Sequence, residues 1–89
     1  MTKRDFTDDS ADWFDTDESD LLGSTTTEGE TASLEENVWF IPDGGFAYER
    51  TIFSGGDIER ECEHIDGPTA AAWLNANDHD VPEDIAHFL

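Results

Sequence analysis

Residues 37–65 have the sequence NVWFIPDGGFAYERTIFSGGDIERECEHI, in which three strand-like runs are separated by two short turns. The first run, Val38 to Ile41, is apolar and is followed by Pro42 to Gly45, where proline presets φ and glycine accepts a positive φ. The second run, Phe46 to Phe53, is rich in aromatic and β-branched residues, and Ser54 to Gly56 turns the chain again. Connections this short predict an antiparallel meander of three strands.

The third run, Asp57 to Ile65, alternates strictly between two kinds of side chain. Acids occupy every second position, which predicts that one row of the strand faces solvent. The acidic row is Glu59, Glu61 and Glu63, and the other row is Ile58, Arg60, Cys62 and His64.

Two short helices are expected after the meander. Asp66 to Thr69 combines a capping acid with a proline in the first turn, which is typical of a helix start, and Ala70 to Asn75 continues that helix. A second helix is expected from Val81, with acids in its first turn and an apolar stripe of Ile85, Phe88 and Leu89. The sequence therefore predicts an α+β fold, in which a small three-stranded meander precedes two short helices.

The N-terminal third differs in composition from the rest. Residues 1–36 consist mainly of Asp, Glu, Ser, Thr and Gly, and Gly23 to Ser33 contains no large side chain. Such a composition predicts a flexible linker. We therefore expect two parts, a long flexible acidic arm at residues 1–36 and a small β-β-β-α-α domain at residues 37–89.

The charge of the chain is extreme, with 23 acidic residues against 4 Lys and Arg and a net charge of −19. Acids are spread over both parts, and Lys3 is the only lysine. In molar salt the Debye length falls to about 3 Å, so a surface of carboxylates no longer destabilises the folded state. This composition resembles that of proteins from extremely halophilic archaea and their viruses, so acidity alone does not indicate nucleic-acid mimicry.

Several functional classes have little support. A single cysteine, Cys62, excludes an internal disulfide, and neither a signal peptide nor a run of about 18 apolar residues is visible. We expect a cytoplasmic location in a halophilic host, or a place in a virion. Only Arg50 and Arg60 supply positive charge in the expected domain, too few for direct binding of nucleic acid.

Catalysis and metal binding are not expected either. The chain has no nucleophile–base motif and no glycine-rich loop between a strand and a helix, so we expect no enzyme, no cofactor and no small-molecule substrate. Four soft ligands are available, but their spacing does not form two close pairs, so no metal site is expected. These residues are Cys62, His64, His79 and His87.

Large apolar residues within the acidic arm suggest a docking motif. Such residues can insert into the groove of a partner and order the segment on contact, although they could also fold back onto the chain's own sheet. A three-stranded sheet has one face that two short helices can cover, so some strand residues should also stay exposed. The predicted partner-binding residues are Phe6, Trp13, Phe14, Leu21, Leu22, Trp39 and Ile41.

Three functional hypotheses follow from these patterns. The leading one is a small non-enzymatic structural or adaptor protein of a halophilic archaeal system, in the favoured case a virion component. It would bridge neighbouring protein subunits through its arm and the exposed apolar face of its sheet, in a larger assembly or a homo-oligomer. The second is a nucleic-acid mimic or antitoxin-like inhibitor that binds a basic protein. The third is a regulatory adaptor that recruits its partner through the acidic, aromatic arm.

Overall fold

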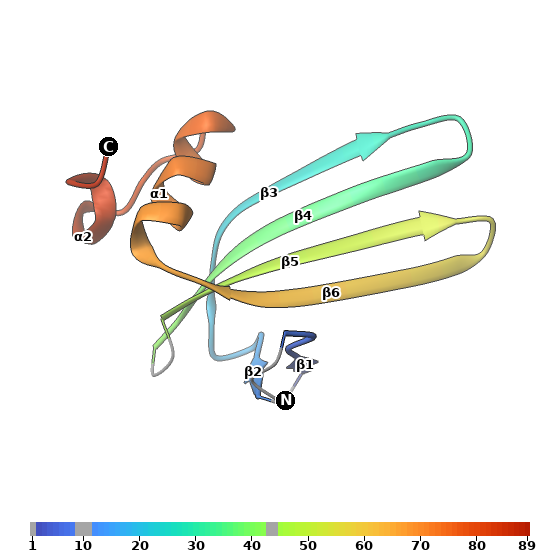
Figure 1. Cartoon of the computed structure of the whole chain (residues 1–89), viewed down its shortest axis with the longest axis horizontal. Coiled ribbons are helices and arrows are strands. Elements are labelled where there is room, and N and C mark those ends of the chain that lie inside the picture. Colours follow the sequence, from blue (N-terminus) through green and yellow to red (C-terminus); the bar gives the residue numbers. More distant parts are fainter. Residues whose placement is uncertain (1, 9–11, 43–44) are drawn as a thin grey trace.

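The chain folds mainly into antiparallel β-structure, as a computed structural model that describes residues 2–8, 12–42 and 45–89 shows (Figure 1). These residues form a two-stranded sheet, a four-stranded sheet and two short helices. In chain order the elements are β1 (Lys3–Asp5), β2 (Trp13–Asp15), β3 (Asp20–Glu28), β4 (Ala32–Ile41), β5 (Gly45–Ser54), β6 (Asp57–Ile65), α1 (Gly67–Ala76) and α2 (Glu83–Ala86).

The larger sheet is a simple meander with the strand order β3-β4-β5-β6. Val38 pairs with Tyr48 across β4 and β5, and Phe46 pairs with Ile65 across β5 and β6. Gly55 and Gly56 both have positive φ, at 56° and 90°, and they turn the chain between β5 and β6. A two-residue turn with two positive φ angles matches the twist of antiparallel strands.

The predicted α+β fold with a flexible acidic arm is wrong. Strands occupy the three segments expected between residues 37 and 65, but β3 adds a fourth strand from within the expected linker, and β1 and β2 form a hairpin within the expected arm. Strands predominate over helices in the described residues. The physical reason is that Thr25, Thr26 and Thr27 are β-branched and suit an extended strand, and pairing with β4 satisfies the backbone groups on the inner side of β3.

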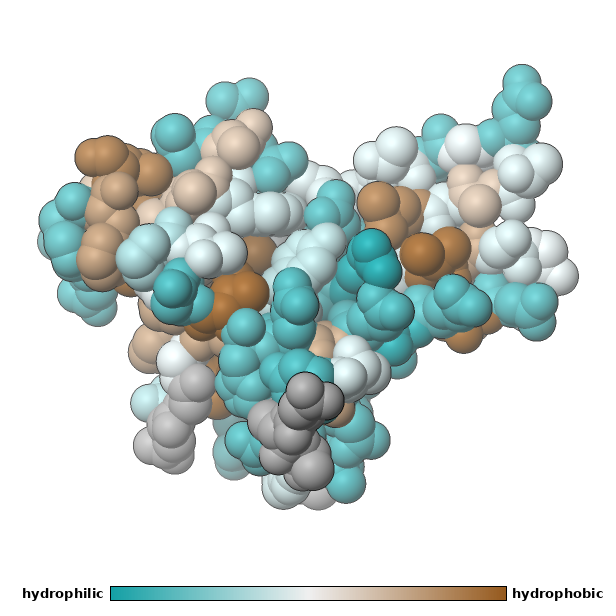
Figure 2. All heavy atoms as spheres, viewed as in Figure 1, coloured by the Kyte–Doolittle hydropathy of each residue, from teal (hydrophilic) through white to brown (hydrophobic). Residues whose placement is uncertain are grey.

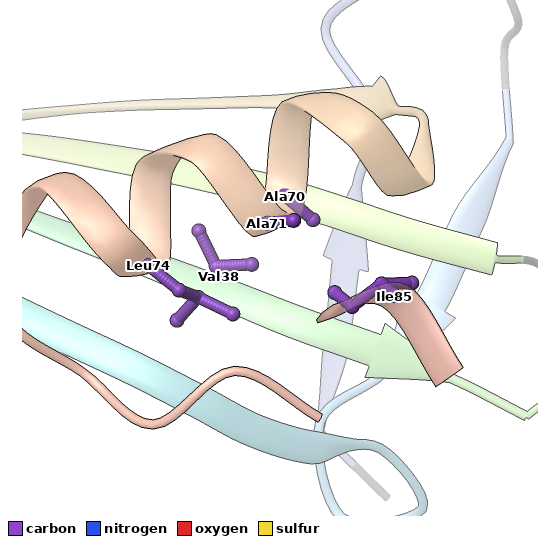
Figure 3. Close-up of a cluster of buried hydrophobic side chains, with 5 residues drawn as sticks. All are labelled: Val38, Ala70, Ala71, Leu74 and Ile85. Carbon is purple, nitrogen blue, oxygen red and sulfur yellow. The ribbon is translucent and has the colours of Figure 1, made fainter. Parts of the chain in front are cut away.

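The sheet has a small hydrophobic core on each face. On one face, Val38 of β4 packs with residues of α1 and α2, and Figure 3 shows these side chains gathered between the helices and the sheet. The other face is covered by the β1–β2 hairpin and its neighbouring residues. The helix-side core is Val38, Ala70, Ala71, Leu74 and Ile85, and the hairpin-side core is Phe6, Phe14, Ala47 and Cys62.

The helix start predicted at Asp66 is confirmed. The Oδ1 atom of Asp66 accepts a hydrogen bond from the backbone N–H of Thr69 at 2.9 Å, and Pro68 lies in the first turn. This cap places α1 directly after β6, so the helix packs back onto the sheet. Within the described part of the chain, neither helix has the length and apolar character needed to cross a membrane.

Both cores lie toward the same end of the sheet, and the other end extends away from them. Figure 1 shows the turns β3–β4 and β5–β6 reaching beyond the helices and beyond the β1–β2 hairpin. We call residues 24–34 and 51–60 the projecting end of the sheet.

Candidate interaction surface

The projecting end carries apolar side chains on the helix-side face. Leu34 of β4 and Ile52 of β5 are register partners, so their side chains lie next to each other on this face, and both are half-buried. They line a shallow hollow of about 300 Å³ together with Thr27, Gly29, Ala32, Ser33 and Arg50. Neither helix reaches this hollow, so the apolar pair is available to another molecule.

The opposite face of the projecting end is also apolar at one point. Phe53 of β5 pairs with Ile58 of β6, and these side chains are 37% and 62% exposed. The β1–β2 hairpin packs farther along this face, around Ala47 and Cys62. Figure 2 shows apolar surface on the projecting end, separated by a polar belt from the apolar surface near the helices.

Charged and polar groups surround these apolar pairs. Arg50 forms an exposed ion pair with Glu61, and Arg60 lies with its Nε atom 3.4 Å from the buried carboxylate of Glu49. Tyr48 donates a hydrogen bond of 2.6 Å to Glu36, and burial together with this contact raises the pKa of Tyr48 above its ordinary value. Both arginines therefore pair within the chain, and the remaining rim is acidic, with Glu28, Glu30, Asp57 and Glu59 exposed.

Glu49 is a buried carboxylate that joins the hairpin to the sheet. Its Oε2 atom accepts a hydrogen bond of 2.8 Å from Nε of Arg4, and its Oε1 atom accepts bonds of 3.0 Å from Asn37 and 3.3 Å from Nε1 of Trp39. Sequence reasoning missed this site. The alternation along β5 could have indicated it, because Glu49 lies on the same face of the strand as Ala47.

A second set of contacts fixes the segment that follows β1. Thr7 donates its backbone N–H to the carbonyl oxygen of Cys62 at 2.8 Å, and Asp8 accepts a hydrogen bond of 3.0 Å from the backbone N–H of His64. The ring of His64 stacks on Phe6 at 3.6 Å between centroids. Cys62 is buried beneath this segment, and burial, followed by the nearby carboxylate of Glu49, raises the pKa of its thiol to about 11.

The structure separates the seven predicted partner-binding residues into three groups, which are buried, exposed and half-buried. Phe6 and Phe14 are buried against the chain's own sheet, and their rings lie 5.3 Å apart. Trp13 and Leu21 are 45% and 50% exposed, and Nζ of Lys3 lies 5.5 Å from the centroid of the Trp13 ring.

The remaining three predicted residues are half-buried. Leu22 lines a hollow of about 260 Å³ beside α2, Trp39 packs on Phe14, and Ile41 packs on the hairpin-side core. The seven residues therefore do not form one surface. Phe53 and Ile58, which the sequence analysis did not select, are exposed side by side.

The four soft ligands do not converge. Cys62 and His64 lie on β6, whereas His79 stacks on Trp73 and His87 contacts Phe88 near the end of the chain. Among residues 2–8, 12–42 and 45–89, no group of three or more His, Cys, Asp or Glu side chains is arranged to hold a metal ion.

Comparison with models of known protein families, with characterised proteins and with solved structures gave no match for this chain. The surface must therefore be interpreted from its own chemistry. It offers one half-buried and one exposed apolar pair at the projecting end of the sheet, with acids around them, which suits binding of another macromolecule.

Proposed function

We propose that this chain is a small non-enzymatic structural or adaptor protein of a halophilic archaeal system, in the favoured case a virion component. In this proposal it holds a neighbouring protein subunit through the projecting end of its sheet. The main support is that Leu34 and Ile52 on one face, and Phe53 and Ile58 on the other, lie beyond both cores of the fold. A two-sided apolar end can be clasped by a partner from both faces.

The acidic rim and the composition support a partner that binds in high salt. At a net charge of −19, long-range interactions between charges dominate binding at low salt. In molar salt, only interactions between charges within about 3 Å of each other remain strong. High salt also strengthens the burial of apolar surface. Apolar contacts at the projecting end would therefore keep their strength where charge contacts fade.

The experiment is co-purification of the tagged chain from a halophilic host or particle in about 2 M salt. We expect a stoichiometric companion protein, and we expect the double substitution Phe53→Ser with Ile58→Ser to lose it. The matched control is Trp13→Ser with Leu21→Ser, which removes two comparably exposed apolar side chains elsewhere on the molecule. Circular dichroism and protection of Cys62 from alkylation show that each variant is folded.

Two results would contradict the proposal. One is that the unaltered chain purifies without any stoichiometric companion in high salt. The other is that the Trp13 and Leu21 variant loses the companion while the Phe53 and Ile58 variant keeps it, which would place the interface on the surfaces that the sequence analysis selected.

The net charge supports one second candidate, an inhibitor that mimics nucleic acid by occupying the basic groove of a protein. Such a complex depends on the release of counterions and weakens steeply as salt rises. If the companion is basic and dissociates between about 0.1 M and about 2 M salt, charge mimicry is favoured. Persistence of the complex in high salt favours the structural role.

A further inference from the structure

The two edges of the four-stranded sheet differ in how well they are protected against pairing with another strand. At the β6 edge, residues 7 and 8 occupy backbone groups: Thr7 bonds to the N–H and the carbonyl of Cys62, and Asp8 bonds to the N–H of His64. The outer part of β6 also carries charged side chains at alternate or adjacent positions from Asp57 to Glu61. Occupied backbone groups and charge are both devices that prevent edge-to-edge pairing.

The β3 edge has neither protection along the projecting end. β3 terminates the strand order, and within the described residues no strand or loop lies hydrogen-bonded to its outer side from Ser24 to Glu28. A register shift between Leu21 and Gly23 disturbs only the start of the strand. From Ser24 onward the strand therefore presents a regular row of backbone donors and acceptors.

The side chains of this edge are neutral in a molecule that is otherwise dense with acid. Leu21 to Thr27 contains no charged residue, and Ser24, Thr26 and Thr27 are exposed. Threonine favours extended backbone, so the segment is well suited to receive another strand. The acids Asp20 and Glu28 lie at the two ends of the strand, so the segment between them carries no charge that would repel a second copy of this acidic chain.

We infer that the β3 edge pairs with the β3 edge of a second copy of this chain, in antiparallel orientation, to form a continuous eight-stranded sheet. Identical strands related by a two-fold axis are self-complementary, because each donor meets the acceptor of the other copy. This arrangement brings the neutral segments together and sends the two acidic β6 edges to opposite sides of the dimer. A dimer formed through any acidic surface would instead oppose like charges.

The inference goes beyond the proposed function and is independent of it. The dimer uses the outer side of β3, whereas the proposed companion binds the faces of the projecting end. A five-residue edge buries little area, so we expect a dimer that dissociates on dilution and not a permanent one.

The test is sedimentation velocity of the full chain in about 2 M salt, over concentrations from about 10 μM to about 1 mM. We expect the average mass to rise toward twice that of the single chain. A mass that remains that of the single chain over the whole range would overturn the inference.

Two proline substitutions locate the interface. Successive N–H groups along a strand point to opposite sides, so the N–H groups of Thr25 and Thr26 differ in direction. One of the variants Thr25→Pro and Thr26→Pro therefore removes an N–H that points away from β4 and leaves the pairing with β4 intact. That variant should stay folded, as judged by protection of Cys62, and should remain monomeric at every concentration. Thr26→Val is the matched control, since it keeps the backbone donor and should still dimerise.

If the proline variant that lacks the outward N–H is folded and dimerises as well as the unaltered chain, the inference is overturned. If neither proline variant folds, hydrogen exchange of the unaltered chain decides the question. We then expect amides of residues 24–28 to exchange about tenfold more slowly at the highest concentration than at the lowest, and equal rates would overturn the inference.

Discussion

A single carboxylate connects the N-terminal hairpin to the sheet. Glu49 is buried on β5 and accepts hydrogen bonds from Arg4, Asn37 and Trp39, and Arg60 lies nearby. A buried charge is costly unless it is paired and hydrogen-bonded, and here each oxygen has partners. Glu49 therefore favours the conformation in which β1 lies against the sheet.

We predict that Glu49→Ala destabilises the fold strongly, because it leaves Arg4 beside a buried site without its carboxylate. Removing one member of a buried pair costs about 3 kcal/mol, and high salt screens a buried pair only weakly. Urea unfolding in high salt measures the change in the free energy of unfolding. Glu61→Ala is the control, since it breaks the exposed pair with Arg50 and should change stability little. Equal stabilities of the two variants would show that Glu49 has no structural role.

The thiol of Cys62 provides a pH-dependent signal for the same region. Its pKa is raised from 9.0 to about 11, first by burial and then by the carboxylate of Glu49. The unfolded thiol ionises at lower pH than the folded one. This group's contribution to stability is therefore complete below about pH 9 and is lost as pH rises through about 11.

We predict that the thiolate absorbance of the folded chain appears near pH 11, and that in urea it appears near pH 9. Subtracting the spectrum of the Cys62→Ser variant removes the contribution of tyrosine. A folded thiol that titrates at the same pH as the unfolded one would mean that Cys62 is solvated and that the hairpin does not cover it.

At the scale of elements, the β1–β2 hairpin is held on the sheet by Phe6 and Phe14, which face inward, whereas Trp13 faces outward. We predict that Phe14→Ala loses about 3 kcal/mol of stability and allows rapid alkylation of Cys62, because the core beneath the hairpin is opened. Trp13→Ala is a matched control, since it removes a larger aromatic side chain from the adjacent, exposed position. It should leave Cys62 protected.

Alkylation rates at fixed pH, measured by mass spectrometry on the intact protein, compare the two variants directly. If Trp13→Ala exposes Cys62 as much as Phe14→Ala does, this result contradicts the orientation in which Phe14 faces the sheet and Trp13 faces solvent.

The elements that could be predicted from the sequence are those with a local signal. The alternation of β6, the Gly55–Gly56 turn and the cap at Asp66 are all visible within a few residues. β3 was missed because Ser, Thr and Gly suggested a linker by composition, although three consecutive threonines before Gly29 are also a strand-and-turn signal. Its strand conformation depends on β4, which begins beyond the turn.

The candidate site was predicted less completely than the strands, for a related reason. Whether an aromatic side chain in an acidic segment faces a partner or its own sheet depends on contacts between residues far apart in the sequence. Phe6 lies against His64, and Phe14 lies against Trp39, so the burial of these rings is set by tertiary packing. Phe53 and Ile58 stay exposed because the packing of the hairpin residues against the sheet does not extend to them.

At the scale of the whole molecule, the fold concentrates its covering elements at one end. Two short helices and one hairpin shield opposite faces of the same part of the sheet, and the strands continue past them (Figure 1). The radius of gyration is 13.4 Å and the longest dimension is 41 Å, so the molecule is elongated along its strands. This shape separates a structural end from an end that is free for binding.

The net charge of −19 acts on the molecule as a whole, and it opposes association with another acidic chain least where the contacting surfaces are neutral or apolar. The projecting end meets that condition on both faces at Leu34, Ile52, Phe53 and Ile58, and along the outer side of β3. Binding by the faces and pairing by the edge can therefore occur together in an assembly.

Hydrogen exchange of the chain, alone and in complex with its co-purified companion in about 2 M salt, tests the role of the projecting end most directly. Residues 51–60 are the decisive segment, because they lie on β5 and β6, away from the β3 edge where a second copy would pair. We predict that the companion slows exchange in residues 51–60 and leaves residues 3–8 and 12–15 unchanged. Slowing confined to those N-terminal residues, with no change in residues 51–60, would contradict the assignment of the binding surface.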